Sequence, residues 1–73
     1  MNIRKTIGKN IATRRACLRM TQVQLANAIG CSRSLVQWVE WGKRSFPFEN
    51  VPQLVKVLKI QDYNQLFEKD AFI

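Results

Sequence analysis

The sequence contains no histidine, and five of its 73 residues are acidic. General acid–base or nucleophilic catalysis needs an imidazole, a pair of carboxylates, or a thiol or hydroxyl activated by a neighbouring base. The five carboxylates are scattered along the chain and form no evident pair. We therefore expect a protein that is not an enzyme.

Cysteines and long apolar runs are also scarce. Cys17 and Cys31 lie fourteen residues apart, and without histidine they cannot complete a four-ligand zinc site within one chain. We expect two partly buried packing residues, because a reducing cytosol disfavours a disulfide. No apolar run reaches the ~20 residues of a membrane span, and no signal peptide is evident. The sequence thus predicts a cytoplasmic protein without a metal, cofactor, small-molecule ligand or membrane association.

The positive charge is concentrated in one part of the chain. The net charge is +7, and residues 1–44 hold nine Lys/Arg and one acidic residue, a net +8, whereas residues 45–73 carry −1. A one-sided positive field suits a polyanion, because each neutralised phosphate releases counterions. A solvated basic face that aids solubility is the alternative. The basic half of the chain contains the motif described next, which favours nucleic acid as the binding partner.

Residues 21–44 have the pattern of two short helices joined by a tight turn. A capping box begins the first of these two helices, and a glycine, which tolerates the positive φ of a helix end, closes it. A serine caps the second helix, and another glycine closes it. These residues are, in order, Thr21 with Gln24, Gly30, Ser32 and Gly42. Helices joined so closely must cross steeply, which is the layout of a helix-turn-helix DNA reader.

Helical spacing of apolar residues predicts the remaining elements. The first helix should span about 3–18, and a fourth, capped by Asn50, should run from about Val51 to Leu58. Asp62 can cap a last helix. The prediction is an all-α fold of five helices, with the helix-turn-helix at the second and third. Residues 1–69 form the domain, and residues 70–73 form a C-terminal tail.

The predicted recognition helix, residues 32–41, divides into two faces. Val36, Val39 and Glu40 turn inward, and the outward set is Arg33, Ser34, Gln37, Trp38 and Trp41. In the major groove Arg donates to guanine, Gln pairs with adenine, and Ser bonds to either, so these three side chains are candidate base readers. Ordinary surface residues are the alternative. Gln22 and Ser32, at helix starts, are candidate phosphate contacts.

Trp38 and Trp41 are unusual on a polar face. If both point outward they expose a large apolar patch, which usually marks a binding surface. Contact with thymine methyl groups is one role, and a protein partner over this face is another. We favour DNA contact for Trp38 and expect Trp41 to fold back over the junction with the fourth helix.

Nearly the whole chain resembles the Cro/C1-type helix-turn-helix proteins, also called XRE or lambda-repressor-like, which include phage repressors and restriction-modification controllers. The resemblance is carried by IGKNIATRRACLRMTQ, QLANAIGCSRS, VEWGKR, FENVPQLVKVLKI and NQLFE. It implies base contacts at Arg33, Ser34 and Trp38, and DNA backbone contacts at Lys43 and Arg44.

The resemblance also implies an ion pair between Arg15 and Glu40 that ties the first and third helices together. It places the start of the fourth helix near Phe48. Family members seldom carry a proline at the position of Pro52, so this chain departs from the family pattern there.

We expect a transcriptional regulator that binds a double-stranded DNA operator of two half-sites as a homodimer, without a small-molecule effector. The dimer interface should lie in the nearly neutral C-terminal half, at Leu66, Phe67, Phe72 and Ile73. The alternative is an antitoxin-like module that holds a protein partner through Trp38, Trp41 or the C-terminal aromatics.

Overall fold

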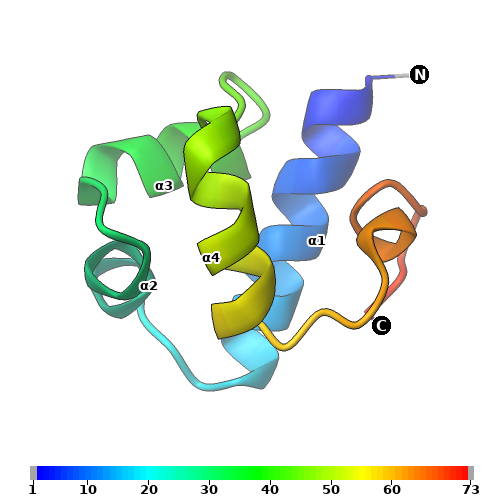
Figure 1. Ribbon diagram of the computed structural model, residues 1–73. Helices are drawn as coiled ribbons and strands as arrows, with labels where there is room; N and C mark the ends of the chain where they lie inside the picture. Colours follow the sequence, from blue (N-terminus) through cyan, green and yellow to red (C-terminus); the bar gives the residue numbers. More distant parts are fainter. Residues whose placement is uncertain (1, 73) are drawn as a thin grey trace.

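The computed structural model describes residues 2–72. Within this range the chain forms four α-helices, two 3-10 turns and no strand. The elements in order are α1 (Ile3–Cys17), α2 (Gln22–Ile29), α3 (Arg33–Glu40), the 3-10 turn η1 (Phe48–Asn50), α4 (Val51–Val57) and the 3-10 turn η2 (Tyr63–Leu66) (Figure 1). The all-α class is confirmed. The count of five helices is wrong, because η2 replaces the last predicted helix.

Side-chain caps begin α2 and α3 at the predicted residues. The hydroxyl of Thr21 accepts from the Gln24 N–H at 3.0 Å, and the Gln24 side chain accepts from the Thr21 N–H at 2.8 Å. Ser32 Oγ accepts from the N–H of Leu35 at 3.2 Å. Asn2 caps α1, which the sequence pattern did not single out. These hydrogen bonds confirm the predicted starts of α2 and α3. The starts were predictable because capping depends on residues only three positions apart.

The four helices of the described range share one way of ending. Each is followed by a residue with positive φ, and the next N–H donates to a carbonyl five residues back, which is the Schellman arrangement. The left-handed residues are Arg19 (φ 59°), Gly30 (φ 75°), Gly42 (φ 77°) and Lys59 (φ 55°). Gly30 and Gly42 have the predicted role, whereas two basic side chains occupy the other two positions.

The core lies where α1, α2, α3 and α4 meet. Its fully buried apolar side chains are Ile11, Leu25, Val36, Val39, Leu54 and Leu58. At Gly8, α1 touches α3 backbone to backbone, because a Cβ there would collide with the carbonyl oxygens of Val39 and Glu40. No side chain therefore separates α1 from the C-terminal end of α3.

Asn10 explains why the C-terminal segment is not a fifth helix. This buried side chain, 2% exposed, donates through Nδ2 to the carbonyls of Gln65 at 3.1 Å, Leu66 at 2.9 Å and Glu68 at 2.8 Å. These carbonyls face a side chain instead of an α-helical N–H. Asp62 does cap the segment, accepting from the Asn64 N–H at 2.9 Å, but one 3-10 turn follows.

The start of α4 also differs from the prediction. Asn50 makes no side-chain cap, because its φ of −87° and ψ of −15° are already helical, whereas a capping residue is typically extended. The chain begins to turn at Phe48, near the position that the resemblance implies, but it does so as η1. Pro52 fits in the first turn of α4, where its missing N–H has no intrahelical partner.

The two cysteines are free thiols with different surroundings. Cys31 is half-buried as predicted, and burial raises the pKa of its thiol. Cys17 is exposed, contrary to prediction, because it lies off the α1 stripe that carries Ile7 and Ile11. Among residues 2–72, no helix is long and apolar enough to cross a membrane.

Candidate nucleic-acid interface

The helix-turn-helix is formed by α2, a three-residue turn and α3. Gly30 reverses the chain at the end of α2, and the Cys31 N–H bonds to the Ala26 carbonyl at 2.9 Å. Ser32 then starts α3. In Figure 1, α2 is seen end-on while α3 runs across the view, so the two helices cross steeply. The crossing leaves one side of α3 uncovered by α2.

The uncovered side of α3 carries the predicted base-reading residues. Arg33 and Ser34 are exposed, Gln37 is half-buried, and Trp38 is 43% exposed. Val36 and Val39 are buried, as predicted for the inward face. The side chains of the first turn can therefore reach a groove, while the apolar side of α3 holds it on the core.

The two tryptophans form an edge-to-face pair. Their ring centroids are 5.5 Å apart and their planes are inclined by 83°. Trp41 is 54% exposed, so the expectation that it folds back over the junction with α4 is not met. Its partner is Trp38, one turn earlier on α3, because aromatic rings prefer this geometry. The pair makes an apolar surface at the C-terminal end of the helix.

Glu40 joins three helices. Its side chain is 6% exposed, and its Oε2 accepts from Arg15 Nε at 2.7 Å. Its Oε1 accepts from Arg15 Nη2 at 3.1 Å and from Gln22 Nε2 at 3.0 Å. Arg15 Nη1 donates in addition to the Met20 carbonyl at 2.7 Å. The ion pair implied by the resemblance is present, and the Gln22 bond adds α2 to it.

The candidate phosphate contacts near α3 differ in their exposure. Ser32, Lys43 and Arg44 are exposed, at the two ends of α3. Gln22 is half-buried, and one N–H of its amide is used by Glu40. The other N–H remains to donate, so Glu40 orients this amide at the N-terminus of α2.

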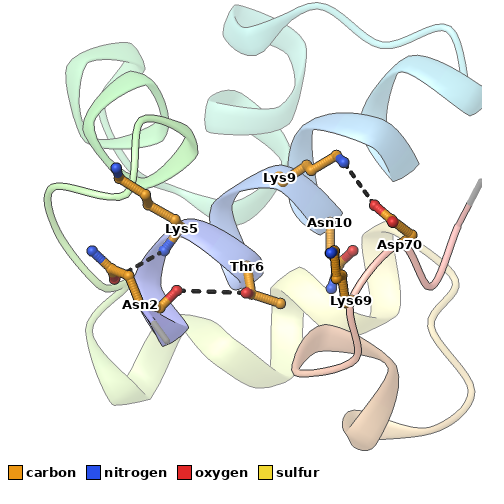
Figure 2. Close-up of a pocket in the computed structure, with 7 residues that line it drawn as sticks. All are labelled: Asn2, Lys5, Thr6, Lys9, Asn10, Lys69 and Asp70. Carbon is orange, nitrogen blue, oxygen red and sulfur yellow. Dashed lines mark hydrogen bonds and ion pairs between the residues drawn. The ribbon is translucent and has the colours of Figure 1, made fainter.

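A second basic region lies at the start of α1. A pocket of about 430 Å³ lies here, and Figure 2 shows the residues that line it: Asn2, Lys5, Thr6, Lys9, Asn10, Lys69 and Asp70. Lys9 donates to Asp70 at 2.6 Å, and this hydrogen bond lowers the pKa of the Asp70 carboxyl. Lys9 is therefore paired within the chain. The segment expected to be a tail lies back on α1 through Asp70.

The predicted dimer residues differ in how far they are exposed. Leu66 is 5% exposed and packs in the core, so little of its side chain is accessible to a partner. Phe72 is half-buried, and its ring centroid lies 5.6 Å from the Arg14 guanidinium carbon. Phe67 is 49% exposed and is available to a partner. Ile73 lies outside the described residues.

Comparison with known proteins supports the geometry. Neither the curated proteins nor the solved structures contain a match to the chain. A family model described as a helix-turn-helix domain matches residues 7–63, which extend from α1 to the start of η2. The matched range includes α2, α3 and the Arg15–Glu40 pair. The chain therefore belongs to this helix-turn-helix domain family.

Proposed function

We propose that the protein is a sequence-specific DNA-binding transcriptional regulator of the Cro/C1 type, which acts by binding and not by catalysis. The division of α3 carries this proposal. Val36 and Val39 hold the helix on the core, while Arg33 and Ser34 are exposed on the opposite side. Arg and Ser are suited to reading base edges in the major groove. The half of the chain that contains this helix carries a net +8.

Each candidate contact has a separate task in this proposal. Bases are read by Arg33, Ser34, Gln37 and Trp38. Phosphates are held by Gln22, Ser32, Lys43 and Arg44. The phosphate contacts position α3 without selecting a sequence, whereas the base contacts select it.

A homodimer is proposed from the size of the molecule. The described residues extend 28 Å along the longest axis. Successive major grooves on one face of DNA are about 34 Å apart, so one copy with one α3 reaches one half-site. Two copies related by a twofold axis read two half-sites. A Cro-like phage repressor and a restriction-modification controller both fit this arrangement, and the neighbouring genes would distinguish them.

Selection from a random duplex library tests the function directly. We expect enrichment of an inverted repeat whose half-sites are about 10 base pairs apart, centre to centre. Arg33→Ala should lose the preference at one base pair of each half-site, whereas Lys56→Ala, which removes the same charge from an exposed position on α4, should retain it. Salt-sensitive binding with no enriched sequence would overturn the proposal.

The exposed Trp38–Trp41 pair favours one second candidate, a module that binds a protein partner through this face. Tryptophan fluorescence in a Trp41→Phe background separates the two functions. Contact with DNA should shift or quench the Trp38 emission on operator, and Trp38→Ala should weaken binding by about 1 kcal/mol or more. An unchanged spectrum at saturating operator, together with normal affinity of Trp38→Ala, would favour the protein partner.

A further inference from the structure

An apolar pocket of about 130 Å³ lies between the first half of α1, the α3–α4 connection, α4 and η2. Its floor is formed by the buried side chains of Ile11, Leu54 and Leu66. Tyr63 and Phe67, 53% and 49% exposed, stand at its mouth. Apolar cavities of about 150 Å³ take up benzene. The pocket is therefore of a size and chemistry to receive one aromatic ring.

Phe48 lies beside this pocket and does not fill it. It is 88% exposed, the most exposed of the large hydrophobic side chains in residues 2–72. Ser45, Phe46 and Val51, its neighbours along the chain, all line the pocket. An aromatic ring in water next to an unfilled apolar pocket is the type of surface that marks a binding site.

We propose that the occupant is a second copy of the chain, with Phe48 of each protomer inserted into the pocket of the other. A twofold interface needs a surface that is complementary to itself, and here the ring and the pocket share one face. This inference rests on the proposed homodimeric regulator and names the contact through which its two copies meet.

The charges favour a second copy at this face. Two molecules of net charge +7 repel each other, but residues 45–73, which supply Phe48 and most of the pocket, carry −1. Glu49 follows Phe48, and Arg44 lines the pocket. Insertion of the ring therefore brings a carboxylate of one protomer toward a guanidinium of the other.

Sedimentation without DNA tests the contact. We expect the wild type to dimerise and Phe48→Ala to raise the dimer dissociation constant at least about tenfold, the effect of losing a central aromatic anchor. Phe48 is too exposed for this change to perturb the core, which a thermal melt checks. Val23→Ala is the matched control, because Val23 is a 47% exposed apolar residue on α2, away from the pocket.

Isotope-filtered NMR on a mixture of labelled and unlabelled protein locates the ring. We expect nuclear Overhauser effects between Phe48 of one protomer and the methyl groups of Ile11 and Leu54 of the other. A dimer without these effects, or one unchanged by Phe48→Ala, would overturn the inference. A wild type that stays monomeric to about 100 µM would overturn it as well, and would leave the pocket to another partner.

DNA binding separates failure of this contact from failure of the proposed function. If Phe48→Ala still prefers a single half-site and loses the preference for paired half-sites, both proposals stand. If the wild type dimerises through Phe48 and binds no DNA sequence preferentially, the contact stands and the regulator does not.

Discussion

At the level of single residues, the side-chain amide of Asn10 makes three long-range hydrogen bonds from one nitrogen. Its Nδ2 has two hydrogens and lies within 3.1 Å of three carbonyl oxygens, so at least one hydrogen is shared. These oxygens belong to residues more than fifty positions away along the chain. One amide therefore attaches the C-terminal segment to α1.

Removing this amide should release the segment. We expect Asn10→Ala to lower the free energy of unfolding by about 2–3 kcal/mol, because one buried and two partly buried hydrogen bonds to carbonyls lose their donor. Asn10→Asp has nearly the same size but presents a carboxylate to the same oxygens, so it should destabilise at least as much at pH 7. Urea titrations measure both, with exposed Asn64→Ala as the control. Equal midpoints for Asn10→Ala and Asn64→Ala would contradict this role.

The proposed division between base and phosphate contacts is also testable one residue at a time. Arg33→Ala should cost about 1–3 kcal/mol on the best site and relax one base preference, whereas Lys43→Ala should weaken all sequences alike and reduce the salt slope by about one. Titrations on specific and random duplexes at several salt concentrations provide the comparison. If both variants lose the same affinity on both duplexes, Arg33 does not read a base.

At the level of secondary-structure elements, the helix ends differ in how well their residues suit a positive φ. Glycine adopts this backbone freely, whereas a residue with a Cβ pays about 1–2 kcal/mol. Arg19 and Lys59 are both in this position. The ends of α1 and α4 are therefore strained relative to the ends of α2 and α3.

Glycine at these two ends should relieve the strain. We expect Arg19→Gly and Lys59→Gly each to raise stability by about 0.5–1 kcal/mol, the relief exceeding the added entropy of the unfolded chain. Gly30→Ala makes the reverse change where no atom lies within 4 Å of the new Cβ, so its loss of about 1 kcal/mol reports backbone strain alone. Thermal melts that rank the three variants otherwise would refute this account.

The hydrogen bonds of Glu40 with Arg15 and Gln22 attach α3 to α1 and α2. Glu40→Gln should lower the free energy of unfolding by about 3 kcal/mol, because it leaves a partly buried guanidinium without its anion. In the Glu40→Gln variant, Arg15→Met should lower the free energy of unfolding much less than it does in the wild type, because it removes the guanidinium that Glu40→Gln left unpaired. A double-mutant cycle with strictly additive losses would show that the two side chains do not interact.

At the level of the whole molecule, the local features of the fold could be predicted and the long-range ones could not. The caps of α2 and α3 and the turn at Gly30 depend on residues a few positions apart, which a sequence pattern displays. The Arg15–Glu40 pair came from the family resemblance, since spacing alone does not pair residues twenty-five positions apart. Asn10 gave no signal, because a polar residue on a predicted helix normally faces water and its partners are distant backbone atoms.

The same limit explains the errors in the candidate site. Leu66 was predicted at an interface because it is apolar and lies in the nearly neutral C-terminal half, whereas its burial depends on the packing of η2 against α1. The pairing of Trp41 with Trp38 depends on side-chain rotamers, which periodicity does not specify. The use of a Gln22 amide hydrogen by Glu40 could have been anticipated only after α2, α3 and α1 were placed together.

The contact at Gly8 limits how the proposed dimer could accommodate an operator of unfavourable geometry. Side chains can change rotamer when two helices slide, but the carbonyls of Val39 and Glu40 lie directly against the α1 backbone and have no such freedom. The angle between α3 and α1 is thus fixed within the chain. In the proposed dimer, when the separation of two half-sites does not match that of the two α3 helices, the duplex must bend or twist to meet them. Base steps that no side chain touches would then influence affinity through the stiffness of the DNA.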